Sequence, residues 1–392
     1  MKEKKLQVIM LDPANLTPYY NYALCSGLNK AGVDTTLYST KFVADETLEA
    51  EVGIDFVDFY FKRFRTLQQG KQRILRQLLR GISYPFDHYR LLRRLRHRKA
   101  DIVHWQWTRL PIIDLWLMNR LHALGIPSVI TIHDVTPVYR AGSDKQRLRV
   151  LNQAEALIVH DASAKSALLM RYPELPTAKI FEIPHGPLQA DKLGSAYNKG
   201  RARAMLNIAP ERKVVLFFGE IKHYKGLDVL IDAFGALEGP RPELLLLVAG
   251  EPNKDCQPDF SKLSALGLEH QSDLRYLPAA DVWKYFKASD LVVLPYREIS
   301  QSGVLFSALA HGRAVIVSDV GGMPEVVRRL DAGWVISRES PDELADAITE
   351  ALSDMHELQA RGIKAQIAVE EIYGWGAIGK KTLRVYRNVC GE

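Results

Sequence analysis

A short segment with two glycines and two lysines is the first feature of this sequence that could bind an anion. It runs from Gly219 to Gly226, directly after the apolar run KVVLFF. Lys222 and Lys225 supply positive charge, and a helix starting near Leu227 would point its free N–H groups at the same place. The segment is not a P-loop, because G-x-x-x-x-G-K-S/T is absent. Its residue types fit a diphosphate, and they also fit an ordinary strand-to-helix turn with solvated lysines.

A second candidate anion site follows the apolar run DLVVLPY. Ser302, Gly303 and Val304 would open a helix whose first N–H groups have no partner within the helix and can hold an anion. Serine is also a common N-cap, so a capped helix without a ligand is the alternative. The anion-binding interpretation of this segment is strengthened because the segment would lie in register with the lysine segment.

Several separate motifs follow one another here in the order known from one enzyme family. The succession FFGEIKHYKG, VAGE and SGVLFSALAHGRAVIVSDVGGMPEVV resembles the retaining glycosyltransferases of family 4 over most of residues 213–330. The first half is similar more loosely, through DIVHWQW, TIHDVTP and EIPHG. The resemblance implies the GT-B fold, an α/β architecture of two Rossmann-like doubly wound domains facing an interdomain cleft. It implies a nucleotide-sugar on the second domain and an acceptor on the first.

The resemblance also implies a set of donor-binding residues, from which this chain departs at two places. Glu220 stands where the family usually has an arginine, and Lys222 could replace that charge. The two family glutamates fall on Ile299 and Ser307; Glu298 lies one residue from the first, and no carboxylate is near the second. Donor affinity and sugar choice are therefore left open. The implied donor-binding residues are Gly219, Lys222, Lys225, Glu298, Ser302, Gly303, Val304 and Ser307.

Histidines follow several apolar runs of the first half. His133 comes after PSVITI, at the strand end where a parallel sheet places functional groups, and the resemblance implies that it is the catalytic histidine near the reacting carbon. The alternatives are a buried structural histidine or a helix cap made with Asp134. For His104 the structural interpretation is favoured, and His185 fits either interpretation.

Tyr19, Tyr20 and Asn21 occupy the place of the family's glycine-rich loop, and we expect them to contact acceptor or donor. We expect no metal and no cofactor, because the sequence contains no DxD motif and the lysines with the helix N–H groups are available to neutralise the leaving diphosphate. The nucleotide-sugar would be a substrate.

Alternating strand and helix patterns must position these residues. A polar stretch after residue 184 interrupts the rhythm, which predicts domains at residues 1–196 and 197–371 and a C-terminal helix, residues 372–392, that crosses back to the first domain. A helix is expected at residues 20–32. The predicted strands are 6–11, 34–39, 54–60, 101–105, 127–132, 156–160, 213–219, 244–250, 274–278, 290–296 and 314–319.

The composition is that of a soluble two-domain protein. The chain has 392 residues, 47% of them hydrophobic, and three scattered cysteines, which fits a reducing compartment. No apolar run approaches the length needed to cross a bilayer. The net charge of +6 is concentrated in the first half, whereas the second half is mildly acidic. We expect a cytoplasmic protein associated peripherally with the inner face of the membrane.

The basic character is strongest in residues 61–100, where Asp87 is the only acidic residue. One helical stripe holds Ile74, Leu75, Leu78, Leu79 and Ile82 among Arg73, Arg76 and Arg80; a second holds Leu91, Leu92 and Leu95 among Arg90, Arg93, Arg94, Arg96 and Arg98. Basic amphipathic helices bind anionic membrane surfaces. A helix pair packed on the sheet with solvated arginines ranks second, and nucleic acid ranks last because no nucleic-acid module accompanies the helices.

Together these features predict a metal-independent hexosyltransferase that moves a sugar from a UDP- or GDP-sugar to a glycan or lipid-linked acceptor, in the synthesis of cell-surface polysaccharide. Two alternatives remain open. One is a nucleotide-sugar epimerase on the same fold, and the other is a binding subunit without activity, which Glu220 and Ser307 would explain.

Overall fold

The chain forms two compact units, unit 1 from Met1–Pro184 with Trp375–Glu392 and unit 2 from His185–Gly374. The computed structural model describes residues 5–41, 54–62, 73–135, 142–187, 198–237, 241–299 and 302–391. The predicted boundary between residues 196 and 197 lies outside the described residues. The one predicted after residue 371 falls within the last helix of unit 2, which ends at Tyr373.

Unit 1 is built on a parallel sheet with the strand order β3-β2-β1-β4-β5-β6-β7. Its central strands are short apolar runs, and most of their side chains are buried, as expected for strands covered on both faces. The strands are β1 (Gln7–Asp12), β2 (Asp34–Ser39), β3 (Asp55–Asp58), β4 (Ile102–Trp105), β5 (Ser128–Thr131), β6 (Ala156–Val159) and β7 (Ile180–Glu182).

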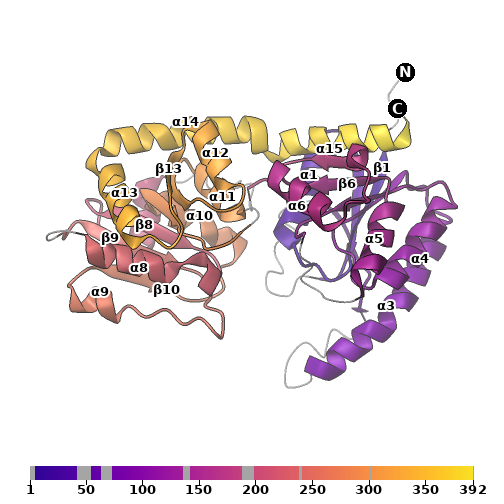
Figure 1. Cartoon of the computed structure of the whole chain (residues 1–392), viewed down its shortest axis with the longest axis horizontal. Helices are drawn as coiled ribbons and strands as arrows, with labels where there is room; N and C mark the ends of the chain where they lie inside the picture. The colour runs from indigo at the N-terminus through magenta and orange to yellow at the C-terminus, as the bar shows by residue number, and fades with distance from the viewer. Residues whose placement is uncertain are drawn as a thin grey trace. The chain divides into compact units, whose positions relative to one another are not determined.

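Helices cover this sheet (Figure 1). They are α1 (Pro18–Lys30), α3 (Arg73–Leu95), α4 (Pro111–His122), α5 (Asp144–Gln153), α6 (Ala162–Arg171) and α15 (Trp375–Cys390). The C-terminal helix α15 packs against α1, so the last residues of the chain belong to the same unit as the first.

Unit 2 repeats the plan with the strand order β10-β9-β8-β11-β12-β13. Alternate residues of β8 enter two different apolar clusters, because the strand is covered by helices on both faces. The strands are β8 (Lys213–Phe218), β9 (Leu244–Ala249), β10 (His270–Asp273), β11 (Leu291–Leu294), β12 (Ala314–Ser318) and β13 (Gly333–Ile336). Both sheets are parallel and doubly wound, as the sequence predicted.

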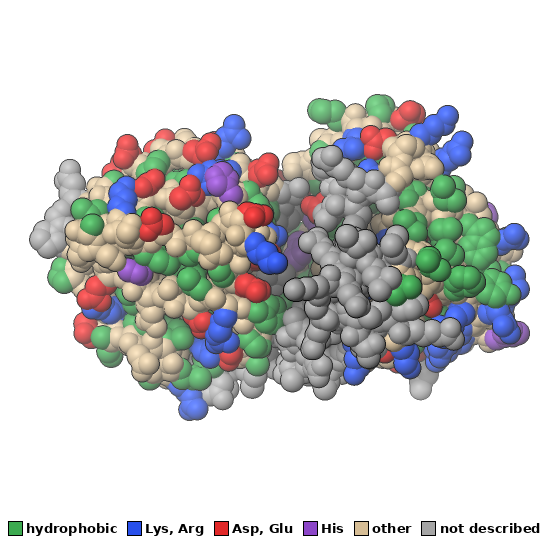
Figure 2. Space-filling model, turned by 90° about the horizontal axis from the view of Figure 1, so that it is seen from below, with side chains coloured by type: hydrophobic (Ala, Val, Ile, Leu, Met, Phe, Trp, Pro, Cys, Tyr) green, Lys and Arg blue, Asp and Glu red, His purple; other side chains and the backbone are tan. Residues whose placement is uncertain are grey.

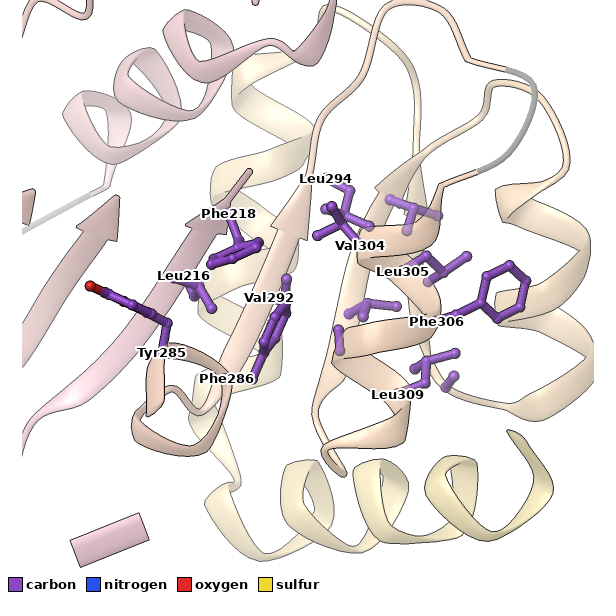
Figure 3. Close-up of a cluster of buried hydrophobic side chains, with 14 of the residues drawn as sticks. Leu216, Phe218, Tyr285, Phe286, Val292, Leu294, Val304, Leu305, Phe306 and Leu309 are labelled. Atoms are coloured by element: carbon purple, nitrogen blue, oxygen red, sulfur yellow. The ribbon is translucent and has the colours of Figure 1, made fainter. Parts of the chain in front are cut away.

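The helices of unit 2 include α11, which packs on the sheet through Val304, Leu305 and Leu309. Figure 3 shows this cluster, with Val304 at the start of α11 and Leu294 at the end of β11. The helices are α7 (Lys199–Met205), α8 (Leu227–Ala236), α9 (Ser261–Ala265), α10 (Ala279–Ala288), α11 (Gly303–Ala310), α12 (Met323–Leu330), α13 (Pro341–Ser353) and α14 (Met355–Tyr373).

Three strand predictions need correction. The strand predicted at residues 274–278 was wrong, because the chain pairs instead at His270–Asp273, whose residues are mostly polar and partly exposed. Strands β7 and β13 were not predicted. All three lie at a sheet edge, where one side of the strand has no neighbour and an apolar run is not required.

The basic region also differs from the two packed helices considered above. Residues 73–95 form one helix, α3, with Pro85 inside it. Leu91, Leu92 and Leu95 are buried in the core of unit 1, so the structural interpretation is correct for the second stripe. Of the first stripe, Ile82 is exposed, whereas residues 63–72 and the side chains of residues 73–78 lie outside the described part.

In the described part of the chain, none of the helices combines the length and the apolar character that crossing a bilayer requires.

Candidate functional site

The candidate donor site lies at the point where the strand order of unit 2 reverses. Strands β8 and β11 are neighbours, but the chain continues from β8 toward β9 on one side and from β11 toward β12 on the other. The connections after these strands therefore diverge beyond their carboxyl ends, which is where ligands bind in doubly wound sheets. The lysine segment follows β8, and α11 follows β11, so both predicted anion-binding segments meet at this point.

Lys225 lies inside this site. Its side chain is only 8% exposed, and Nζ lies 5.7 Å from the centre of the Tyr296 ring. A Cβ placed on Gly219 would lie 2.9 Å from Nζ and 3.5 Å from a methyl carbon of Val304, so the structure brings these three predicted residues together. Burial lowers the pKa of Lys225 to about 8, with Glu220 opposing the shift and Lys222 adding to it.

Lys222 is in a different situation from Lys225. It is more than one-third exposed, and Nζ lies 2.8 Å from a carboxylate oxygen of Glu220. The residue that departs from the family pattern, Glu220, thus offsets the charge that was predicted to replace the missing arginine. An exposed pair of this kind contributes little. Lys225 is therefore the main cation of the segment.

Arg297 holds the lysine segment in place, and sequence reasoning missed it. Its guanidinium donates to both carboxylate oxygens of Asp228, at 2.9 and 2.7 Å, to the carbonyl oxygen of His223 at 2.7 Å, and to Glu339. Its backbone N–H donates to the carbonyl oxygen of Tyr224. The residue just beyond β11 thereby anchors the segment that follows β8. This contact joins positions 69 residues or more apart in the chain, so only the topology reveals it.

The predicted helix start is confirmed at α11, but its later positions offer no carboxylate. Ser302 is the N-cap, and its hydroxyl oxygen accepts from the N–H of Leu305. Ser307 is buried within the helix, and its hydroxyl donates to the carbonyl oxygen of Gly303 at 2.9 Å. Glu298 is exposed, and Ile299 packs against the core of unit 2.

In unit 1, His133 lies two residues beyond β5 and is surrounded by aromatic rings. Its ring stacks on Trp107 with 5.0 Å between centroids and meets the edge of Tyr20 at 4.7 Å. Its Nε2 lies 3.0 Å from the side-chain oxygen of Gln106, and its Nδ1 lies 3.3 Å from Nε2 of His160. The helix-cap alternative cannot be compared with the structure, because residues 136–141 lie outside the described part; the next described helix, α5, is capped by Ser143.

Tyr19, Tyr20 and Asn21, which occupy the place of the family's glycine-rich loop, lie in the first turn of α1, so the helix begins two residues before its predicted start. Pro18 occupies the start of the helix, where its fixed φ and missing N–H cost nothing. Asn21 is fully buried and donates to the carboxylate of Asp12 at 2.8 Å. Tyr20 packs against His133, whereas Tyr19 is partly exposed.

The other two histidines named in the sequence analysis are accounted for. His104 is fully buried between the hydroxyls of Tyr386, at 2.6 Å, and Thr131, at 2.8 Å. Burial lowers the pKa of His104 to about 3, so the ring is neutral and structural. His185 belongs to unit 2 and stacks on Phe306.

A pocket in unit 1 opens next to His133, beyond the carboxyl ends of β4 and β5. His133, Gln106 and Trp107 line it on one side, and Arg109 and Arg147 bring positive charge into it. A stacked indole beside polar side chains suits a sugar or another polyol, because the ring face packs on the C–H groups while the polar groups meet hydroxyls. The two arginines also suit an anion.

Comparison with protein-family models gives matches in both units. The model described as Glycosyltransferase Family 4 matches residues 18–186, and the model described as Glycosyl transferases group 1 matches residues 198–368. The first covers most of unit 1, including His133, and the second covers Lys225, Arg297 and α11.

Individual proteins agree with this pattern. A D-inositol 3-phosphate glycosyltransferase of Corynebacterium diphtheriae is 23% identical over 388 residues, which cover 94% of this chain and 88% of that protein. Sucrose-phosphate synthase from Thermosynechococcus elongatus superposes with a TM-score of 0.73 at 18% identity, covering 99% and 100% of the two chains. An Anabaena protein, HepE, in complex with UDP-glucose superposes with a TM-score of 0.70 at 16% identity, covering 99% and 100%.

Proposed function

We propose that this chain, which belongs to glycosyltransferase family 4 and has the GT-B fold, transfers a hexose from a UDP- or GDP-sugar. The acceptor is a glycan or a lipid-linked acceptor, and the configuration of the sugar is retained. The observation that carries the donor half of this proposal is the buried ammonium of Lys225 beside Gly219 and the start of α11. A buried cation needs an anionic partner, and the free N–H groups of α11 add partial positive charge at the same point.

Sugar transfer needs this positive charge at the stage where the nucleoside diphosphate leaves. During transfer, the bond between the sugar C1 and the diphosphate oxygen breaks, the acceptor oxygen bonds to C1, and the acceptor proton leaves. The nucleoside diphosphate departs with the bonding electron pair, so negative charge develops on its terminal phosphate. Lys225 and the first N–H groups of α11 would stabilise that charge. In this proposal no metal or cofactor takes part, and His133 of unit 1 is the histidine that serves the transfer.

A screen of nucleotide-sugars tests the proposal. We expect a UDP- or GDP-sugar present at about 100 times its Kd to stabilise the folded protein by about 2.7 kcal/mol, whereas sugars without a nucleotide do not. Thermal unfolding identifies the donor, and transfer is then followed with a radiolabelled sugar, with and without EDTA. Nucleotide-sugar binding without turnover on any acceptor would contradict the transferase assignment and favour a binding subunit. Isomerisation of the donor without an acceptor would favour an epimerase.

A phosphorylated polyol is the second candidate for the acceptor. The relative from Corynebacterium diphtheriae is named for inositol 3-phosphate, and the pocket beside His133 contains Arg109 and Arg147. The guanidinium of Arg147 lies 3.5 Å from a carboxylate oxygen of Asp144. This long ion pair neutralises the positive charge of Arg147 only in part, so the arginine can also attract a phosphate. Parallel transfer assays with inositol phosphate and with a polyprenyl-linked glycan distinguish the two candidates.

We further propose that α3 places the enzyme on the anionic inner face of the membrane. Ile82, Phe86 and Tyr89 are between 51% and 66% exposed and recur at helical spacing, and Arg93 and Arg96 continue the same line. Figure 2 shows exposed hydrophobic side chains gathered beside Lys and Arg side chains over unit 1. The opposite side of α3 is buried through Leu91 and Leu95, so the helix presents its exposed face without unfolding.

Liposome flotation tests this face. Replacing Arg93 and Arg96 by glutamine is expected to weaken binding to phosphatidylserine-containing vesicles by about 30-fold, because each cation near the lipid contributes about 1 kcal/mol. The matched control replaces Arg120 by glutamine and Met170 by serine, which are also exposed on unit 1 but lie on other helices. Equal binding of both variants, or binding that is the same on neutral vesicles, would rule out this face.

A further inference from the structure

Four groups in unit 1 form a continuous hydrogen-bonded row across the end of the sheet. Gln106, His133, His160 and Ile183 follow the adjacent parallel strands β4, β5, β6 and β7. The Gln106 side chain lies 3.0 Å from His133 Nε2, His133 Nδ1 lies 3.3 Å from His160 Nε2, and His160 Nδ1 lies 3.1 Å from the carbonyl oxygen of Ile183. Each member is thus placed by its own strand.

The row has a direction because one end can only accept. A backbone carbonyl has no proton, so His160 must carry its proton on Nδ1 and donate it to Ile183. His160 is only 5% exposed, and burial lowers the pKa of its ring. A neutral ring with its proton on Nδ1 has a lone pair on Nε2, which must accept. The partner that donates to it is Nδ1 of His133.

We propose that His160 is a positioning residue: it keeps the proton of neutral His133 on Nδ1 and leaves His133 Nε2 as the nitrogen that gains and loses a proton at the pocket. This rests on the proposed function only in assigning His133 to transfer. Gln106 adapts to either state of Nε2. In the structure its amide oxygen faces Nε2, where it accepts from a protonated nitrogen, and its amide nitrogen lies 2.8 Å from Met10 Sδ and 3.3 Å from His104 Nε2. When Nε2 is unprotonated, a half-turn of the amide lets its nitrogen donate to Nε2 and places its oxygen beside Met10 and His104 instead.

The surroundings keep the two rings in this arrangement. Trp107 stacks on His133, and Tyr20 packs edge-on against both histidines, at 4.7 and 5.5 Å. Turning the His133 ring over would break its contacts with Gln106 and His160 together. Titratable groups near the pair include Tyr20 from α1, Asp134 next to His133, Asp161 next to His160, and the neutral His104, which lies 3.3 Å from the Gln106 amide. Arg109 and Arg147 add positive charge in the pocket beside His133.

Nitrogen NMR of the histidine rings tests the inference directly. In protein labelled with ¹⁵N on its 11 histidines, the His133 ring is assigned by its loss in His133→Gln, and its two nitrogen shifts report which one carries the proton. We expect Nδ1–H in the wild type. His160→Phe keeps a ring against Tyr20 but removes the acceptor of Nδ1, so the oxygen of Gln106 should draw the proton to Nε2. His160→Gln offers an oxygen again and should restore Nδ1–H.

Turnover gives a second readout. His160→Phe is expected to lower kcat at least about tenfold with the KM for the donor within about twofold, since a wrong tautomer impairs a reacting histidine without changing distant contacts. His160→Gln should recover most of kcat, and His122→Phe, which alters an exposed histidine paired with Glu155, should match the wild type. A wild-type His133 with its proton on Nε2, or one unaffected by His160→Phe, would overturn the inference. The NMR result does not need turnover, so it decides even if no transfer is found.

Discussion

Replacing Lys225 by methionine is expected to lower kcat/KM for the nucleotide-sugar by about 100- to 1,000-fold. Loss of one preorganised group that faces developing negative charge has an effect of this size, because the ammonium of Lys225 is buried and its interaction with a charge is weakly screened. Methionine keeps most of the side-chain volume beside Gly219 and Tyr296, so the fold should persist. Steady-state rates with a saturating acceptor, together with the temperature of unfolding, separate lost chemistry from lost structure.

Lys222→Met is the matched control, because it removes the same charge from the same segment. Lys222 is paired with Glu220 at the surface, and such pairs contribute at most about 1 kcal/mol, so a change of no more than about fivefold is expected. If the two variants lost activity equally, the segment would act through its summed charge, and the special role of the buried lysine would be wrong.

The pH dependence of donor binding follows from the same group. Burial brings the pKa of Lys225 from 10.5 to about 8, so the free enzyme loses this charge as the pH rises through 8. Donor affinity should therefore fall about tenfold between pH 7 and pH 9, and Lys225→Arg should abolish the fall.

The contribution of Lys225 to folding stability has the opposite pH dependence. The folded pKa lies below the unfolded one, so between pH 8 and 10.5 the unfolded chain binds more protons and the folded state gains stability with rising pH. A loss of affinity there cannot come from this lysine unfolding the protein.

The strands at the centre of each sheet were predictable from the sequence, whereas of the four edge strands only β3 was predicted. Strands such as β8, β9 and β11 are buried on both faces and therefore read as unbroken apolar runs. The edge strand β10 reads HQSD, and its pairing depends on the neighbouring β9 rather than on its own side chains. The neighbouring run LRYLP was predicted as the strand because it is more apolar. Its Leu277 is indeed buried, but it lies beyond the end of β10.

The candidate site was predictable where one segment supplies it and unpredictable where distant segments meet. Lys225, Ser302 and Val304 each belong to a local motif with a physical signature. Arg297 and His160 carry no such signature: each acts through a partner in the segment that follows a neighbouring strand, and only the strand order brings them together. A clue was present for His160, since it directly follows an apolar run, as His133 does.

The other large effect is expected at Gly226, which joins the lysine segment to α8. Its φ of +69° is in the left-handed region, and a Cβ there would lie 2.1 Å from the carbonyl oxygen of Pro295. That oxygen belongs to the backbone just beyond β11, so it cannot turn away as a side chain would. Gly226→Ala is expected to lower the free energy of unfolding by about 2–5 kcal/mol, combining the left-handed conformation with the overlap.

Gly267→Ala isolates the overlap. Gly267 has nearly the same φ, +66°, but a Cβ there would have no atom within 4 Å. It should therefore show only the conformational cost, about 1–2 kcal/mol. Calorimetry compares the free energies of unfolding of the two variants.

Titration with the donor shows whether the overlap at Gly226 also affects binding. Relief of the overlap must move the segment away from Pro295 and strain the hydrogen bonds from Arg297 to His223 and Tyr224, which displaces Lys225. Gly226→Ala should then lose donor affinity while Gly267→Ala retains it. Equal unfolding energies for the two variants would mean that the two segments are not held in backbone contact, and the rigid donor site argued from that contact would have to be abandoned.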